Sequence, residues 1–161
     1  MSAALYDAAL TFDPLALAAD LTIEGGDLAA ERDLTTAILL SLFTDARAEA
    51  SDPLPEGEKN RRGYWADAYA ETDGDKFGSK LWLLEREKSL VVVAAKAKKY
   101  AEQALEWLKE DGIAQSVGVV AELLPLSAGQ QTKPVLALAV TITKPPDRLI
   151  TFRFRYVWGV A

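Results

Sequence analysis

Carboxylates are the side chains best able to do chemistry in this sequence, because the chain contains no histidine and no cysteine. Their absence excludes the commonest general base, a Ser-His-Asp triad, thiolate metal ligands and disulfides. Four acids gather around one glycine turn, namely Asp67, Glu71, Asp73 and Asp75. A glycosidase uses two carboxyl groups about 5–10 Å apart. These acids therefore define one hypothesis, a lysozyme-like peptidoglycan hydrolase.

The plainer interpretation of the same acids is structural, and the sequence favours it. Aspartates in a glycine turn commonly hydrogen-bond the backbone of the turn itself. Calcium binding is not supported, because the run Asp73–Phe77 lacks the register of an EF-hand loop. The glycines form neither a P-loop nor a dinucleotide fingerprint. The sequence therefore predicts no metal, no cofactor and no enzymatic activity.

The net charge of the chain narrows the classes of molecule that it could bind. The 161 residues carry a formal net charge of −6, which disfavours a dedicated nucleic-acid binder, whose surface must neutralise phosphates. A nucleic-acid-binding accessory protein stays open as an alternative, because aromatic residues near Arg153 and Arg155 could stack on single-stranded bases. Phe152, Phe154, Tyr156 and Trp158 share one strand parity, however, so they are expected to face the core. With no transmembrane span and no signal peptide in the sequence, a soluble cytoplasmic protein is expected.

Hydrophobic periodicity predicts the helices that must position these residues. Leu34–Arg47 is expected to be a helix capped by Asp33. A longer helix is expected from Leu90 to Asp111, capped by Ser89 and ended by Gly112. Its apolar stripe is Val93, Ala97, Tyr100, Ala101, Ala104, Leu105 and Leu108. Between these helices, Ser51–Gly63 is expected to be a loop and Lys80–Lys88 a short helix.

Strands are expected mainly in the last third of the chain, at Ile113–Leu124, Val135–Thr143 and Leu149–Trp158. The last two form a hairpin across the turn at Pro145-Pro146-Asp147. One further strand is expected within Ala16–Glu24. The predicted fold class is α+β, with central helices packed on a mainly antiparallel sheet that ends in a C-terminal β-hairpin. Residues 1–14 are expected to be an N-terminal arm and residues 15–161 a single domain.

Two short phrases around glycine turns concentrate tryptophan and arginine, Arg61–Trp65 and Gly78–Arg86. Tryptophan and arginine are enriched in interface hot spots, so the phrases could mark an interaction surface. They could equally form a local core, in which Trp65 packs against Trp82 while the arginines cap carbonyls or pair with acids. Residue chemistry alone leaves both interpretations open.

At these phrases the chain resembles the Mu-like phage family of small baseplate proteins. The resemblance spans residues 15–157. It is carried by four phrases, which are Leu34–Ala48, Leu54–Gly57 followed by Arg61–Asp67, Gly78–Lys88 and Ala104–Gly112. Tyr64, Ala66 and Lys80 depart from the family's usual residues. The Arg-Gly-aromatic-Trp and Gly-Ser-x-Leu-Trp phrases together are fairly specific, whereas either alone would be weak.

The resemblance implies a structural role in a contractile phage tail, as a sheath-initiator-like wedge component of the baseplate. It implies a place in the virion tail after assembly in the host cytoplasm, with several copies contacting other wedge, tube and sheath proteins. A free strand edge at Val135–Thr143 or Leu149–Trp158 would suit such a platform, because an edge can accept a neighbour's strand.

The candidate interaction or motif residues are Arg61, Arg62, Trp65, Gly78, Ser79, Trp82 and Arg86. Trp65 and Trp82 are expected to be mainly structural. The three arginines are expected to fix the loop or to contact a neighbouring protein.

Overall fold

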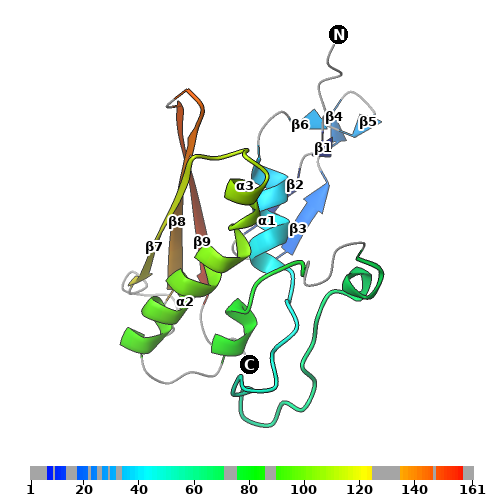
Figure 1. The fold of residues 1–161 in the computed structure, drawn as a ribbon, viewed down its shortest axis with the longest axis vertical. Coiled ribbons are helices and arrows are strands. Elements are labelled where there is room, and N and C mark those ends of the chain that lie inside the picture. The colour runs from blue at the N-terminus through cyan, green and yellow to red at the C-terminus, as the bar shows by residue number, and fades with distance from the viewer. Residues whose placement is uncertain are drawn as a thin grey trace.

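A three-stranded antiparallel sheet with helices packed against it forms the main body of the computed structural model (Figure 1). The structure describes residues 7–8, 10–13, 18–21, 23–24, 27–28, 30–31, 34–70, 76–85, 90–124, 135–146 and 148–157. The sheet comprises β7 (Ser116–Leu124), β8 (Val135–Lys144) and β9 (Arg148–Val157), in the order β7-β8-β9. Since β8 pairs with both neighbours, it is the central strand. The predicted α+β fold with a C-terminal hairpin is confirmed.

Three helices accompany the sheet: α1 (Thr35–Phe43), α2 (Leu90–Ala104) and α3 (Trp107–Glu110). The helix expected from Leu90 to Asp111 is thus interrupted, because the Leu105 and Glu106 N–H groups bond three residues back, 3.3 Å from the Glu102 and Gln103 carbonyl oxygens. The expected stop at Gly112 is confirmed by its φ of +68°. The expected caps Asp33 and Ser89 lie outside the described residues.

The end of α1 differs from expectation. The helix ends at Phe43 rather than Arg47, and Thr44 adopts an extended conformation with ψ 136°. The residues that follow form backbone hydrogen bonds to a distant segment, described below, instead of continuing the helix. Long-range pairing has overridden a local helical pattern here.

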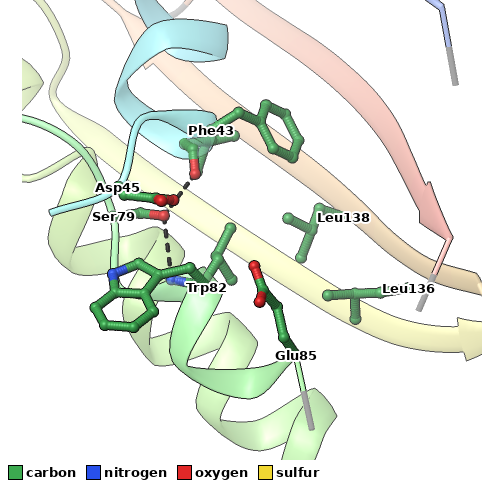
Figure 2. Close-up of a pocket in the computed structure, with 9 residues that line it drawn as sticks. Phe43, Asp45, Ser79, Trp82, Glu85, Leu136 and Leu138 are labelled. Atoms are coloured by element: carbon green, nitrogen blue, oxygen red, sulfur yellow. Dashed lines mark hydrogen bonds between the residues drawn. The ribbon is translucent and has the colours of Figure 1, made fainter. Parts of the chain in front are cut away.

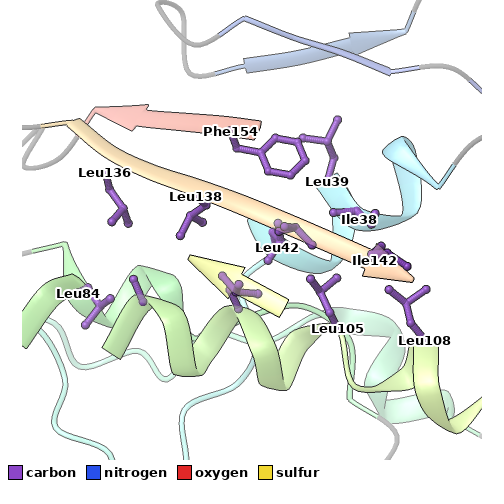
Figure 3. Packing of buried hydrophobic residues seen from close by; sticks show 14 of the residues in the cluster. Ile38, Leu39, Leu42, Leu84, Leu105, Leu108, Leu136, Leu138, Ile142 and Phe154 are labelled. Atoms are coloured by element: carbon purple, nitrogen blue, oxygen red, sulfur yellow. The ribbon is translucent and has the colours of Figure 1, made fainter. Parts of the chain in front are cut away.

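The core lies between the helices and one face of the sheet (Figure 3). Leu136, Leu138, Val140 and Ile142 alternate along β8 and are all buried. Phe154 and Phe152 of β9 stand opposite Leu138 and Val140. The α2–α3 stripe supplies the other layer, with Val93, Ala97, Ala101, Leu105 and Leu108 fully buried. The expected core orientation of Phe152 and Phe154 is confirmed, while the side chains of Tyr156 and Trp158 lie outside the described residues.

The opposite face of the sheet is open in the part of the chain that the structure describes. Val120 on β7 and Leu149 on β9 are 55% and 64% exposed, and Arg153 is exposed beside them. Strand alternation explains the contrast, because neighbouring residues point to opposite faces. No helix among the described residues has the length and apolar character needed to cross a membrane.

Three small antiparallel pairs precede the main body. They are β1 (Asp7–Ala8) with β6 (Ala30–Glu31), β2 (Leu10–Asp13) with β3 (Ala18–Leu21), and β4 (Ile23–Glu24) with β5 (Asp27–Leu28). The strand expected within Ala16–Glu24 is present as β3 and β4. Both strands inside residues 1–14 pair with later segments, and the boundary between arm and domain stays a prediction.

Two adjacent valines on β7 test the assignment of the sheet faces. Val119 is 3% exposed and Val120 is 55% exposed. We expect Val119→Ala to lower the free energy of unfolding by about 2 kcal/mol, because two buried methyl groups are lost. Val120→Ala should lower the free energy of unfolding by less than about 1 kcal/mol, since only the higher β-propensity of valine is lost. Urea unfolding of both variants measures the difference, and equal costs would contradict the assignment.

Candidate functional site

The two glycine-turn phrases meet on an extended segment that leaves α1. On one side, the Ser79 N–H donates to the Thr44 carbonyl (2.8 Å) and the Ala46 N–H donates to the Ser79 carbonyl (2.9 Å). On the other side, the Ala48 N–H donates to the Arg61 carbonyl (2.9 Å). We call residues 44–48 the connecting segment. It places Arg61 and Ser79, which are far apart in sequence, on either side of a single strand-like stretch.

Gly78 is required by two features of its backbone. Its φ is +98°, a backbone conformation that residues with a Cβ atom rarely adopt. A Cβ atom there would also lie 2.4 Å from the Thr44 carbonyl oxygen. Gly63 is similar, with φ +119° and a Cβ position 2.9 Å from the Arg47 Cβ. The glycines of both phrases therefore allow close approach to the connecting segment.

Ser79 and Trp82 complete the junction from inside. The Ser79 hydroxyl donates to the Leu42 carbonyl at the end of α1 and accepts from the Leu81 N–H at 3.2 Å, where the 3-10 helix η2 (Leu81–Leu84) begins. The Trp82 indole N–H donates to the Ala46 carbonyl at 2.8 Å. Both side chains are buried. Ser79 and Trp82 therefore join α1, the connecting segment and η2.

Arg62 is the charged centre of the site. Its Nη1 lies 2.9 Å from Asp45 and 3.1 Å from Glu85, and its Nη2 lies 3.7 Å from Glu58. The guanidinium carbon lies 4.5 Å from the centre of the Trp82 ring, a cation–π distance. Burial of the guanidinium lowers the pKa of Arg62, but the hydrogen bonds to Glu85 and Asp45 outweigh it, so the pKa is raised overall.

The other arginines of the two phrases have different positions. Arg61 donates to the carbonyls of Glu49 and Ala50, the latter at 3.2 Å, so its described contacts hold the loop. Arg86 lies outside the described residues. The basic residue beside Ser79, Lys80, pairs with Asp52 at 2.6 Å. Burial acts to raise the pKa of Asp52, but the hydrogen bonds from Lys80 and the Glu49 N–H and the charges of Lys80 and Arg61 together outweigh it, so the pKa is lowered overall.

Trp65 contradicts the expectation of a structural role. It opens the 3-10 helix η1 (Trp65–Tyr69), which projects away from the sheet (Figure 1), and it is 74% exposed. Tyr69, on the same helix, is 78% exposed, and the two ring centres are 6.3 Å apart. The alternative of a local core, in which Trp65 packs on Trp82, is wrong, because Trp82 is buried at the connecting segment while Trp65 is exposed. We call Trp65 and Tyr69 the aromatic pair.

The base of this projecting loop is closed by residues at its two ends. The Tyr64 and Phe77 rings lie 5.2 Å apart. Asp67 accepts a hydrogen bond from the Phe77 N–H at 3.1 Å. Of the four acids considered for hydrolysis, Asp67 thus serves the loop, and Glu71, Asp73 and Asp75 lie outside the described residues. No group of His, Cys, Asp or Glu in the described ranges could hold a metal ion.

A small cavity opens beside the Arg62 centre (Figure 2). It has a volume of about 60 Å³. Its apolar wall comprises Leu42, Phe43, Leu81, Leu136 and Leu138, and its remaining lining is Asp45, Ser79, Trp82 and Glu85. We call it the Trp82 cavity. The arrangement can take up a small apolar group while carboxylates stand at the margin.

A second, wider cleft of about 670 Å³ lies between the Lys76–Lys80 segment and the end of the α2–α3 layer. Arg47, Lys76 and Lys80 line it together with Glu106, Glu110 and Asp111. Because it mixes both signs of charge, its lining selects neither an anion nor a cation.

Asp45, Glu58 and Glu85 are the site residues that sequence reasoning missed. Asp45 and Glu85 lie 17 and 23 positions from Arg62, so no local spacing pairs them. Asp45 and Glu85 did fall within the phrases that carried the family resemblance, which was the only pointer to them.

The site is therefore a scaffold of backbone bonds, glycines and one charged centre within a small α+β domain. The chain belongs to the family described as phage protein GP46, which matches residues 34–148. It is 40% identical over 136 residues to the baseplate protein gp46 of Escherichia phage Mu, covering 84% of this chain and 87% of that protein. It is 39% identical over 141 residues to the Mu-like prophage FluMu protein gp46 of Haemophilus influenzae, covering 88% of this chain and 90% of that protein.

Alanine at Gly78 tests the close approach to the connecting segment. We expect Gly78→Ala to lower the free energy of unfolding by about 3 kcal/mol or more, because strain in φ adds to a clash with backbone. Gly112→Ala is the matched control, since its φ is also positive but nothing lies within 4 Å of the added Cβ. The control should cost only about 1–2 kcal/mol. Thermal or urea unfolding compares them, and equal losses would show that the approach is not tight.

Proposed function

We propose that this protein is a structural component of a contractile phage-tail baseplate and a platform on which the tail sheath starts to assemble. The observation that carries the structural role is the 40% identity to the baseplate protein of phage Mu across 84% of this chain. The sheath role is a finer proposal, which rests on the geometry of the sheet. The partners would be other wedge, tube and sheath proteins. The protein would be located in the virion tail.

The sheet supports a platform through a strand edge that is unpaired among the described residues. Of the two segments expected to offer an edge, Val135–Thr143 cannot do so, because β8 is paired on both sides. β9 pairs only with β8 among the described strands. Its ladder extends over ten residues, from Arg148 to Val157. Such an edge binds a partner strand through main-chain hydrogen bonds, and side-chain alternation fixes the register.

β7 is the other edge strand, but it is the less suitable one. It lies against both α2 and α3, so an added strand must also fit beside two helices. An exposed edge is otherwise an aggregation liability, which gives the long β9 edge a reason to have a partner in the assembled tail.

A peptidoglycan hydrolase is the less supported function. Asp67, the one candidate acid in the described residues, is engaged with the backbone of Phe77. A structural role needs no catalytic group, and we infer a non-catalytic protein.

Proline scanning tests the β9 edge without deleting the strand. Successive residues of a strand point their N–H groups to opposite sides, so one of Ile150→Pro and Thr151→Pro removes an N–H from the β8 ladder and the other from the free edge. Proline is tolerated where the N–H faces solvent. We expect the edge variant to stay folded, by circular dichroism, and to fail to recruit the cognate sheath protein in a reconstituted tail assembly.

The matched controls for the proline pair are Ile150→Val and Thr151→Val, which keep both N–H groups. They should recruit sheath protein normally. If the folded edge variant recruits sheath protein normally, the β9 edge is not the sheath platform. The baseplate role would be unaffected by that result.

The aromatic pair supplies a second contact surface for a baseplate neighbour. Exposed tryptophan and tyrosine are typical interface anchors. We expect Trp65→Ala to change the free energy of unfolding by no more than about 0.5 kcal/mol, since the side chain is exposed, yet to reduce incorporation into tail particles. Leu40→Ala, which removes an exposed apolar side chain on α1, should incorporate normally. Equal incorporation of both variants, quantified by mass spectrometry of purified particles, would count against this surface.

A further inference from the structure

We propose that the Trp82 cavity and its carboxylate margin bind a basic side chain, of lysine or arginine, from a partner protein. The identity of that partner as a baseplate protein rests on the proposed function, but the chemistry of the site does not. Three observations carry the inference: the charge at the cavity margin, the accessibility of the carboxylates, and the apolar wall.

The first observation is a surplus of negative charge. Asp45, Glu58 and Glu85 all lie within 4 Å of the single guanidinium of Arg62, so three negative charges face one positive charge. Among the described residues, no other lysine or arginine pairs with these three acids. Like charges held together repel. Within the described residues, the cluster therefore carries two more negative charges than Arg62 compensates, and a second cation would offset them.

The second observation is that the surplus can be reached from solvent. The side chains of Asp45 and Glu85 are 42% and 38% exposed, although both line the cavity. Figure 2 shows Asp45 beside Ser79, above the Trp82 ring, and Glu85 to the right of that ring. Arg62 occupies one side of this margin and lies over the Trp82 ring. Arg62 donates to Asp45 Oδ2 and to both oxygens of Glu85, the latter two at 3.1 and 3.2 Å. A carboxylate oxygen has a second lone pair, so these exposed groups can still accept hydrogen bonds from an incoming ammonium or guanidinium group.

The third observation is the apolar wall directly beneath the acids. Leu42, Leu136 and Leu138 line a space of about 60 Å³, several times the roughly 10–15 Å³ that one water needs. A bare metal ion or ammonium gains nothing from such a wall. Lysine and arginine carry an aliphatic stem below a charged head. A basic side chain can place stem methylenes in the cavity and its head against the exposed sides of the Asp45 and Glu85 carboxylates, next to the Arg62 Nη1 that already contacts both.

A series of small probes of matched length tests the site on the full chain. ¹⁵N-labelled protein is titrated with n-butylguanidinium, n-butanol and n-butyrate, and the indole N–H resonance of Trp82 is followed. Trp82 is one of four tryptophans, so the four indole signals separate the cavity from other surfaces. We expect the guanidinium probe to shift the Trp82 signal at millimolar concentration, the alcohol to bind more weakly, and the carboxylate to leave it unchanged.

Charge-neutral variants of similar shape identify the acids. Glu85→Gln and Asp45→Asn should each weaken binding of n-butylguanidinium about threefold to fivefold, as expected of a partly exposed ion pair. Glu110→Gln removes an exposed charge that does not line the cavity and should leave the affinity unchanged. Unfolding curves confirm that all three variants are folded. Addition of salt should weaken binding in the wild type.

Three results would overturn the proposal: equal binding of the alcohol and the guanidinium probe, no shift at Trp82, or the same loss in Glu110→Gln as in Glu85→Gln. Incorporation of Glu85→Gln into tail particles is a separate readout. If Glu85→Gln weakens probe binding but enters tail particles normally, the site is confirmed and its baseplate partner is rejected. If the wild-type protein binds the probe but is absent from purified tail particles, the proposed function is rejected instead.

Discussion

The backbone bonds of the connecting segment are the interaction on which the rest of this structure depends. Residues 44–48 leave α1 and are held by Ser79 on one side and by Arg61 on the other. The Ser79 hydroxyl adds a bond to Leu42 inside α1 itself. These bonds give the helix, η2 and the projecting loop one shared stretch of backbone. Because successive bonds share one short stretch of backbone, loss of any of them weakens its neighbours.

Apolar burial and polar bonding have separate tasks in this domain. The stability comes mainly from the apolar layer between the helices and the sheet, where Val93, Leu105 and Ile142 are fully buried. The polar bonds at the connecting segment add little net free energy each, but an unmade bond in a buried place is costly. Among the described residues, every buried side-chain nitrogen and oxygen has a partner. The polar junction therefore selects one arrangement of segments that the apolar core alone would not specify.

Prediction from the sequence succeeded where periodic hydrophobic spacing determines the structure, and it failed where long-range contacts determine it. The stripe of α2 and the alternation of β8 follow from local spacing, so their buried faces could be predicted. The end of α1 could not, because Thr44 and Ala46 bond to Ser79, more than thirty residues on. Trp65 was misjudged for the same reason: composition shows two tryptophans, but only the fold shows that Trp82 reaches the interior and Trp65 does not. Two of the acids around Arg62, Asp45 and Glu85, were likewise beyond local spacing.

Two consecutive residues connect the proposed contact surfaces. The Phe43 ring packs edge-on against Phe154 of β9 at 5.8 Å. The next residue, Thr44, accepts the Ser79 N–H and allows no Cβ atom at Gly78. Movement of the projecting loop would therefore displace Thr44, and through Phe43 it would press on the edge strand. Close-packed contacts resist such displacement, so these contacts couple the base of the projecting loop to the β9 edge, as the proposed platform would require.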